Sequence, residues 1–539
     1  MTIAGELRDG QPPLSSSRPA LPATNASRGV SADRVAPLVL AAIALAVALL
    51  TVTPWPVGVF QDDAIYVVLA KALAGGDGFR MINIPGAPHA THFPPGYPLL
   101  LAALWKLFPS FPDNIVVFKF VNALFLAGTA AGTYRFARSR LSLDPAGACV
   151  AAMVGTISVV VLVITGVVLS EPLYMVLLLP TLLVAERAAA DDDVRLAAMA
   201  GALIGVLALV RTVGVFLLPA ALLVMVVRRR WRSAAVLAAV ALLFIAPWQA
   251  WVSAYQGETP APLVGKYGAY GPWLSEGYRA GGLPFAWAVL AKNANELFGF
   301  LGYIALPVSP VAPRLASLGI VLGILGAGAV AAWRRVPVTL VFLAGYGAVI
   351  LAWPFEPTRF VLVCWPLLAA LFVAGVRVVW RWRPSALGLR GVRIAGLAAV
   401  AVVTAGYGAD NVRGVRQKWW ANIQSDAGTR AKPIAEWVAR STRPEDVVIT
   451  DHDLIVYLYT GRRAVPTATF TALDRITPRT PAEDAVVLRD MLAHLRPRWY
   501  ITTTQQGIES ATLLAAEHPP QLRYAGSIST ARVYEPVSK

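Results

Sequence analysis

Several residues whose side chains can do acid–base or metal chemistry gather in one polar stretch of the chain. They are Asp62, Asp63, Asp77, His89 and His92. Only 14% of the 539 residues are charged, so this concentration is unusual. A carboxylate can take a proton from a hydroxyl group or hold a divalent cation, and a histidine can supply a nitrogen ligand. The stretch is therefore the candidate reactive centre, with Asp62 and Asp63 as the candidate catalytic acids.

The two adjacent acids follow Pro54-Trp55-Pro56 and open the amphipathic segment DDAIYVVLAKALAGG. Its apolar residues recur at helical spacing, which predicts a short helix at the outer membrane interface with the acids at its N-terminal end. Acids at that position also cap a helix and face the positive end of its dipole. A purely structural role therefore stays open for both carboxylates.

A proline-rich turn, Phe93-Pro94-Pro95-Gly96-Tyr97-Pro98, closes the polar stretch. Proline fixes φ, so such a turn can return the loop against the membrane and hold its polar groups in one place. The spacing of the two histidines is not a metal signature, and ordinary surface histidines are the alternative. If a divalent metal binds, Asp62 and His92 are its candidate ligands.

The composition identifies a membrane protein. Hydrophobic residues make up 57% of the chain and its mean hydropathy is +0.59, beyond what soluble globular proteins reach. Uncharged apolar runs at 35–53, 145–169 and 234–252 are long enough to cross a bilayer as α-helices. The sequence therefore predicts a polytopic α-helical membrane protein.

The net charge of +16 lies mainly in short arginine clusters that flank apolar runs. Clusters of this kind mark the cytoplasmic ends of spans, so they indicate topology and argue against nucleic acid as a partner. Cys149 and Cys364 both fall in apolar runs and predict no disulfide framework.

The order of these runs predicts three parts. Residues 1–33 are expected to form a disordered cytoplasmic tail, residues 34–409 a transmembrane module of about eleven spans, and residues 410–539 an extracytoplasmic α/β domain. Two outer loops are expected, at 54–98 and 253–312. The protein is thus expected in the cytoplasmic membrane, with its reactive loop and C-terminal domain outside.

Beyond residue 410 the pattern changes to alternating helices and strands. Strands are expected at 447–450 and 499–503 with helices around them, which predicts a small βαβ-like sheet. Asp451-His452-Asp453 follows the first of these strands. A metal triplet is one interpretation, and a strand-end turn followed by a helix N-cap is the interpretation we favour.

Taken with motifs elsewhere in the chain, the outer-loop residues resemble membrane glycosyltransferases of the GT-C fold, the group that includes protein O-mannosyltransferases and lipid A aminoarabinose transferases. The resemblance rests on Asp62, Asp63 and Tyr66 after the first span, Gly76-Asp77, Pro94-Pro95, Ser170-Glu171-Pro172, Arg359 and the run Tyr457–Arg462. It implies a GT-C fold and an enzyme that uses a sugar linked to a polyprenyl phosphate. By position, Asp62 is similar to the family's catalytic aspartate, and Asp63 is the weaker candidate.

The chain departs from this resemblance at one position. The aminoarabinose transferases have an acidic-basic pair before the two prolines, where this chain has His92-Phe93. That difference puts aminoarabinose in doubt as the substrate and leaves the sugar open.

Two arginines, Arg211 and Arg359, lie on the predicted outer side and break the positive-inside pattern. Guanidinium groups suit phosphate oxygens, so the phosphate of a lipid would give both a partner. The alternative for each is a snorkelling side chain or an ion pair with Glu356. Glu171, at the outer end of a span, is either a second acid or a helix-start residue.

The expected function is an inverting glycosyl transfer at the outer face of the membrane, from a polyprenyl-phosphate sugar to a glycan, lipid or protein acceptor. Asp62 would accept the proton of the attacking hydroxyl. The candidate substrate-binding residues are Asp77, His89, His92, Tyr97, Glu171, Arg211, Lys266, Tyr267 and Arg359. The main alternative is a membrane transporter or flippase with an external solute-binding domain, which would favour buried mid-span charges and internal repeats. A non-catalytic membrane scaffold is a third possibility.

Overall fold

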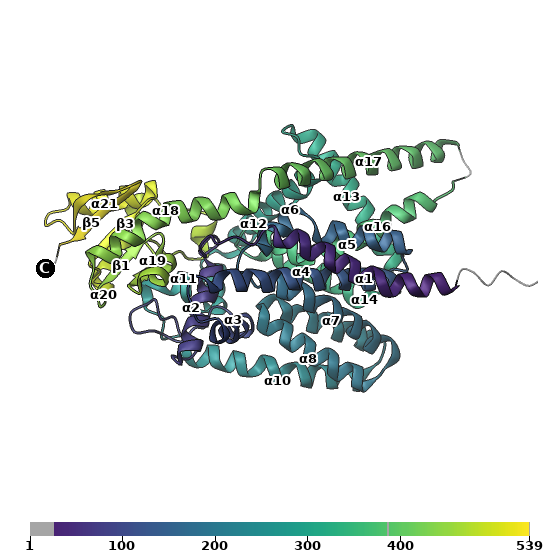
Figure 1. The fold of residues 1–539 in the computed structure, drawn as a ribbon, viewed down its shortest axis with the longest axis horizontal. Helices are drawn as coiled ribbons and strands as arrows, with labels where there is room; N and C mark the ends of the chain where they lie inside the picture. The colour runs from purple at the N-terminus through teal and green to yellow at the C-terminus, as the bar shows by residue number, and fades with distance from the viewer. Residues whose placement is uncertain (1–25, 385–386, 538–539) are drawn as a thin grey trace, which may run out of the picture.

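The computed structural model describes residues 26–384 and 387–537. It shows an elongated molecule in which a bundle of helices takes up most of the length and a small sheet lies at one end (Figure 1). Helix α1 (Ala26–Leu49) begins at the opposite end. Of the tail expected at 1–33, residues 1–25 lie outside the described residues, and α1 already includes the remainder.

Long apolar helices make up much of the bundle. Within the described residues, six helices are long and apolar enough to cross a membrane, or up to seven if the pair α5 and α6, bent by 54°, is one span. The six are α4 (Asn114–Ser139), α7 (Glu171–Asp191), α10 (Trp231–Tyr255), α13 (Val311–Ala332), α15 with α16 (Pro357–Arg381) and α17 (Leu387–Arg416). The chain is a multi-pass membrane protein.

The bundle also contains shorter helices. They are α3 (Gly96–Leu107), α5 (Pro145–Thr156), α6 (Val159–Thr165), α8 (Val194–Val210), α9 (Leu217–Val227) and α14 (Pro337–Ala352). The run 234–252 falls within α10 and the run 35–53 mainly on α1, whereas the run 145–169, expected as one span, is divided between α5 and α6. The number of crossings, about eleven from the sequence, stays a prediction because several of these helices are shorter than a typical span.

Glycines let neighbouring helices approach closely. A Cβ atom on Gly201 of α8 would lie 2.5 Å from the carbonyl oxygen of Leu237 on α10, and one on Gly205 would lie 2.6 Å from Phe244. Small residues at such contacts allow van der Waals packing where lipid supplies no hydrophobic driving force. The pairing fixes α8, and with it the position of Arg211 at its C-terminal end.

The outer loops carry further helices. The first holds α2 (Asp62–Gly75), the short helix expected from the amphipathic pattern. The second holds α11 (Val264–Tyr267) and α12 (Tyr270–Ala305), so most of it is helical. The backbone of α12 turns at Gly282, where φ is 58°, a conformation that favours glycine.

A five-stranded sheet lies near the C-terminus, with the order β2-β1-β3-β5-β4. Strand β1 pairs in parallel with β2 and β3, and β5 pairs antiparallel with β3 and β4. The strands are β1 (Val447–Thr450), β2 (Arg463–Val465), β3 (Trp499–Thr502), β4 (Leu522–Ile528) and β5 (Ala531–Pro536), and the helices are α18 (Trp419–Ser441), α19 (Asp453–Thr460), α20 (Pro481–Leu495) and α21 (Gln505–Ala516). The unit β1-α19-β2 has the expected βαβ form.

The sheet is joined to the bundle by helix. The boundary expected at residue 410 falls inside α17, which continues to Arg416, and α18 follows at Trp419. Figure 1 shows α18 leading from the bundle to the sheet. We refer to residues 419–537 as the C-terminal unit.

Candidate active site

The turn before α2 gives its two acids different surroundings. Asp63 is fully buried, and its carboxylate accepts hydrogen bonds from the backbone N–H groups of Gly58 (2.6 Å), Val59 (3.1 Å) and Phe60 (3.0 Å). Burial raises the pKa of Asp63, and these hydrogen bonds oppose the rise. Asp63 therefore fixes the turn, which is the structural role left open for it, while Asp62 is free to face another way.

Asp62 belongs to a chain of alternating charges that comes from four separate segments. Its Oδ2 atom lies 2.8 Å from Nη2 of Arg359. The Nε–H group of Arg359 donates to Oε1 of Glu171 at 2.6 Å, and Oε2 of Glu171 lies 2.9 Å from Nη1 of Arg211. Each of these residues stands at or near the end of a helix, where a side chain can turn toward the outer loops.

The chain of contacts closes on the helix where it began. Arg211 donates through Nη1 to Oγ of Ser170 at 3.0 Å, and the hydroxyl of Ser170 lies 3.0 Å from that of Tyr66. Tyr66 is one turn after Asp62 on α2. The result is a ring of polar side chains that ties α2, α7, α8 and α15 (Pro357–Val361) together.

Burial within the ring is uneven. Glu171 is fully buried and Arg211 is 8% exposed, whereas Arg359 and Asp62 are 19% and 28% exposed. The buried Glu171 carboxylate compensates both guanidinium groups from behind, as buried charges require. In the described part of the chain, the Nε atom of Arg211 has no hydrogen-bond partner. One buried donor of the ring is thus left for a ligand.

The ring borders an amphipathic cavity of about 480 Å³. Asp62, Tyr66 and Arg211 form its polar wall. The rest of the lining is mainly apolar or aromatic and includes Phe93, Val213, Val215, Phe216, Tyr270, Val349, Ile350, Trp353 and Phe360, with Gln249 as a further polar member. A charged end joined to an apolar wall is the shape that a lipid with an anionic headgroup needs.

The proline turn supports the polar wall. His92 makes a 2.6 Å hydrogen bond through Nδ1 to the carbonyl oxygen of Gly268, and its ring centroid lies 3.8 Å from that of Tyr270, with the ring planes tilted by 40°. Burial lowers the pKa of His92. Tyr97 donates to Asn122 at 3.1 Å and packs edge-on against the ring of Tyr66 at 5.1 Å. His92 and Tyr97 therefore hold residues of the cavity wall from outside it.

Other candidate contacts lie away from the cavity. Asp77 is exposed just after α2. His89 pairs with Glu258 at 2.7 Å. Lys266 lies 3.1 Å from Asp453 of the C-terminal unit, and Tyr267 also donates to Asp453. Asp77, His89, Lys266 and Tyr267 do not line the cavity. Arg359 and Glu171 do not line it either, but they contact its wall residues Asp62 and Arg211 directly.

Metal binding does not fit the residues present. The described residues contain no group of three His, Cys, Asp or Glu side chains placed to hold an ion. Asp62 is already paired with a guanidinium group and His92 with a carbonyl oxygen.

The sequence did not single out several residues of the site. Ser170 joins Tyr66 to Arg211, although it appeared only as part of the Ser-Glu-Pro motif. Gln249 and Tyr270 line the cavity, and their signals were weak: one amide in an otherwise apolar run and one tyrosine in a loop rich in aromatic residues.

The bundle, the ring at its outer loops and the C-terminal sheet define a membrane protein of the GT-C fold, which confirms the resemblance noted from the sequence. The family model described as dolichyl-phosphate-mannose-protein mannosyltransferase matches residues 92–251. The structure is similar to that of ArnT from Cupriavidus metallidurans bound to undecaprenyl phosphate, with a TM-score of 0.52, 15% identity and coverage of 93% of this chain and 98% of that one. For the apo state of the same protein the TM-score is 0.54, again at 15% identity, with coverage of 95% and 99%. No curated protein matches the sequence.

Proposed function

We propose that this protein is a membrane glycosyltransferase that moves a sugar from a polyprenyl-phosphate donor to an acceptor hydroxyl on the extracytoplasmic side. The observation that carries the proposal is that Asp62 and Arg211 share one amphipathic cavity, with Arg359 bridging Asp62 to the ring. The GT-C fold and the match to the mannosyltransferase family model support the same class.

The donor is proposed from the shape and charge of the cavity. Its apolar wall, with Val213, Phe216 and Ile350, suits an isoprenoid chain, and Arg211 at the polar end suits a phosphate. Undecaprenyl phosphate is bound in one of the similar solved structures, which supports a donor of this kind. A lipid-linked donor also explains how a membrane enzyme could work on the extracytoplasmic side without nucleotide sugars.

Charge balance indicates how the phosphate would bind. The two carboxylates of the ring neutralise the two guanidinium groups, so long-range attraction for an anion is small. Recognition then depends on directed N–H groups, and Nε of Arg211 is a buried donor that still needs an acceptor. Glu171 would keep both guanidinium groups aimed at the headgroup.

The proposed reaction is a single displacement with inversion. Asp62 accepts the proton of the attacking hydroxyl as the new bond forms at the anomeric carbon of the sugar. The bond from that carbon to the phosphate oxygen breaks, and the lipid phosphate leaves with the electron pair. Arg211 and Arg359 stabilise the charge that develops on it. The proton then passes from Asp62 to water.

Binding of the lipid phosphate tests this site directly. Undecaprenyl phosphate should bind the purified Arg211→Gln protein at least about tenfold more weakly than the parent, because one charge-assisted contact is lost. Arg232→Gln is the matched control. Arg232 is exposed, stands in the first turn of α10 and does not line the cavity. Equal affinity of the Arg211→Gln protein and the parent, measured in lipid nanodiscs, would remove Arg211 from the phosphate site.

A further inference from the structure

A buried ion pair fastens the C-terminal unit to the second outer loop. Asp453, the first residue of α19, is 2% exposed. Its carboxylate lies 3.1 Å from Nζ of Lys266 and also accepts the hydroxyl hydrogen of Tyr267. Lys266 and Tyr267 are buried as well. Breaking a buried pair of this kind leaves an uncompensated charge, so the contact strongly favours one relative position of the two parts.

A short stretch of backbone, residues 266–270, connects the ion pair to the cavity. Lys266 and Tyr267 end α11, and the carbonyl of the next residue, Gly268, bonds to His92 at 2.6 Å. Tyr270 then begins α12, packs against the ring of His92 and lines the cavity. The backbone held by Asp453 is therefore the backbone that presents Tyr270 to the cavity.

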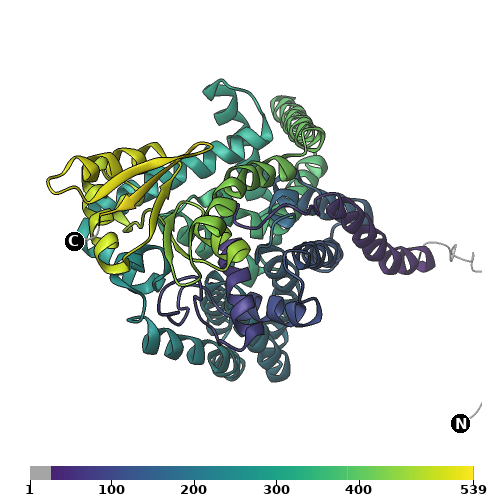
Figure 2. The ribbon, with the colours of Figure 1, turned by 60° about the vertical axis from the view of Figure 1, so that its left-hand side comes forward.

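The same helix, α19, also touches the turn that holds Asp63 and presents Asp62. A Cβ atom on Gly58 would lie 2.5 Å from Cγ1 of Ile455, so this turn packs directly against α19. The backbone N–H group of Gly58 donates to Asp63 on the other side. Figure 1 shows the labels α2, α11 and α19 together at the sheet end of the bundle, and Figure 2 turns this end toward the viewer.

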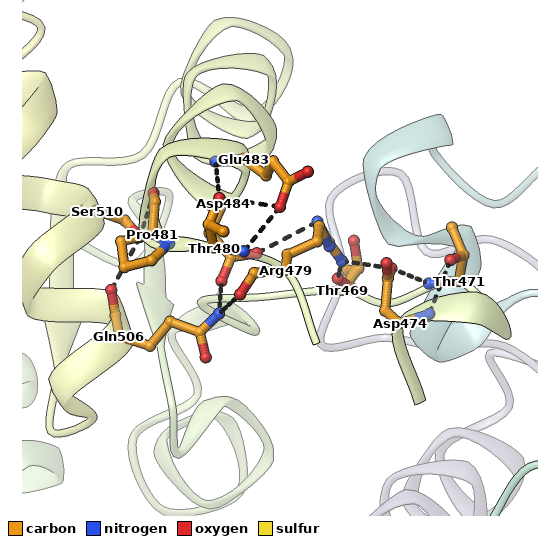
Figure 3. A network of polar contacts seen from close by, with 10 residues as sticks. All are labelled: Thr469, Thr471, Asp474, Arg479, Thr480, Pro481, Glu483, Asp484, Gln506 and Ser510. Carbon is orange, nitrogen blue, oxygen red and sulfur yellow. Dashed lines mark hydrogen bonds and ion pairs between the residues drawn. The ribbon is translucent and has the colours of Figure 1, made fainter. Parts of the chain in front are cut away.

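A loop of the C-terminal unit packs against the second outer loop. The backbone of Phe470 lies so close to Gly265 that a Cβ there would be 2.8 Å from its nitrogen, and Trp273 donates to the carbonyl of Phe470 at 2.9 Å. Figure 3 shows how the chain after Phe470 is anchored: Arg479 pairs with Asp474 (3.0 Å) and Asp484 (3.4 Å). The loop around Phe470 is thus fixed to α20 of the C-terminal unit.

We propose that the C-terminal unit is a structural part of the active site, in which α19 clamps both outer loops and Asp453 is a positioning residue for the cavity. Asp453 touches no substrate in this account. It acts through Lys266 and Tyr267 on Tyr270, while Ile455 acts on the turn before Asp62. The kinetic part of this inference rests on the proposed glycosyltransferase function, and the structural part does not.

The test compares Asp453→Asn, Lys266→Met and the double variant with the parent. Amide hydrogen exchange at residues 264–273 should be faster in Asp453→Asn. Transfer from a polyprenyl-phosphate sugar should lose about ten- to hundredfold in kcat, because small misplacements of a binding wall slow chemistry strongly. The double variant, which buries no unpaired charge, should recover part of both effects. Glu535→Gln is the control, since Glu535 pairs with Arg498 at the surface of the same unit.

Unchanged exchange at 264–273 in a folded Asp453→Asn protein would overturn the clamp, and so would an unchanged kcat with faster exchange. If Asp453→Asn does not fold, Tyr267→Phe removes one hydroxyl of the clamp and should show the same changes at smaller size; unchanged exchange and kcat there would equally overturn it. If the parent itself transfers no sugar, the proposed function fails, and the exchange measurement alone decides the clamp.

Discussion

Asp62 and Asp63 are neighbours in the chain, but their carboxylates make different contacts. Asp63 satisfies three backbone N–H groups of a buried turn, so its oxygens are occupied by the fold. Asp62 faces the cavity and is held by a single guanidinium group. Glu171 orients both arginines. Among the described residues, Nη2 of Arg359 faces the Asp62 carboxylate at 2.8 Å, whereas Nε of Arg211 is a buried donor without a hydrogen-bond partner.

His92 predicts a pH dependence of stability. Burial lowers its pKa below the ordinary value near 6.5, so the folded protein favours the neutral ring. As the pH falls through about 6.5, the unfolded chain gains a proton on this ring that the folded protein takes up only at lower pH, and the free energy of unfolding therefore decreases. His452 has the same direction of shift and contributes equally to parent and variant.

The measurement is the thermal midpoint of the parent and of His92→Gln between about pH 7.5 and pH 5.5, in one detergent. On acidification, the thermal midpoint of the parent should fall by more than that of the variant. Parallel curves would contradict the assignment of a neutral, buried His92.

The sequence predicts a site residue when its neighbours in the chain mark it, and misses a contact that depends on distant segments. Asp62 stood out because it lies beside other polar groups after an apolar run. Its partner Arg359 is 297 residues away, and only the fold brings the two within 2.8 Å. Lys266 and Tyr267 were expected at the substrate because they lie in an outer loop, whereas the C-terminal unit buries both against Asp453.

Among the elements, the apolar runs predicted the bundle helices well because length and hydropathy are local properties. The extent of α12 was hidden by its glycines and by Pro284, which interrupt the helical pattern. Strand β2 has only three residues, Arg463–Val465, and its pairing with β1 depends on a partner elsewhere in the chain. The boundary expected at residue 410 was inferred from a change in composition, but α17 continues through that position to Arg416.

Gly58 gives a prediction for the junction between the first outer loop and α19. Its φ is +108°, and a side chain there would collide with Ile455. Gly58→Ala should therefore destabilise the protein by about 1–3 kcal/mol through backbone strain and overpacking. The double variant with Ile455→Ala should regain the packing part in thermal unfolding.

Gly86→Ala is the matched control, because Gly86 has φ +81° and open space around the added Cβ. It should show the backbone strain without the collision. If Gly58→Ala and Gly86→Ala lose equal stability, and Ile455→Ala does not rescue the former, the packing of α19 against this turn is not what the structure indicates.

At the scale of the whole molecule, the site lies at one end of the bundle. Helix α10 runs from Trp231, in an arginine-rich segment, to Tyr255, whose ring lies 3.9 Å from that of His89 in the first outer loop. Gln249, near the C-terminal end of α10, lines the cavity together with Arg211, so the arginine-rich segment and the cavity lie at opposite ends of this helix. From the positive-inside rule we predict that the arginine end is cytoplasmic and that the site is extracytoplasmic.

We propose Asp62 as the base of a sugar transfer from a polyprenyl phosphate. The most direct measurement is the turnover of a radiolabelled polyprenyl-phosphate sugar by the purified parent, by Asp62→Asn and by Asp77→Asn. We predict transfer by the parent, a loss of about 10²–10⁴-fold in Asp62→Asn and near-parent turnover in Asp77→Asn, whose carboxylate is exposed away from the cavity. Undiminished turnover in Asp62→Asn, or no transfer by the parent, would contradict the account.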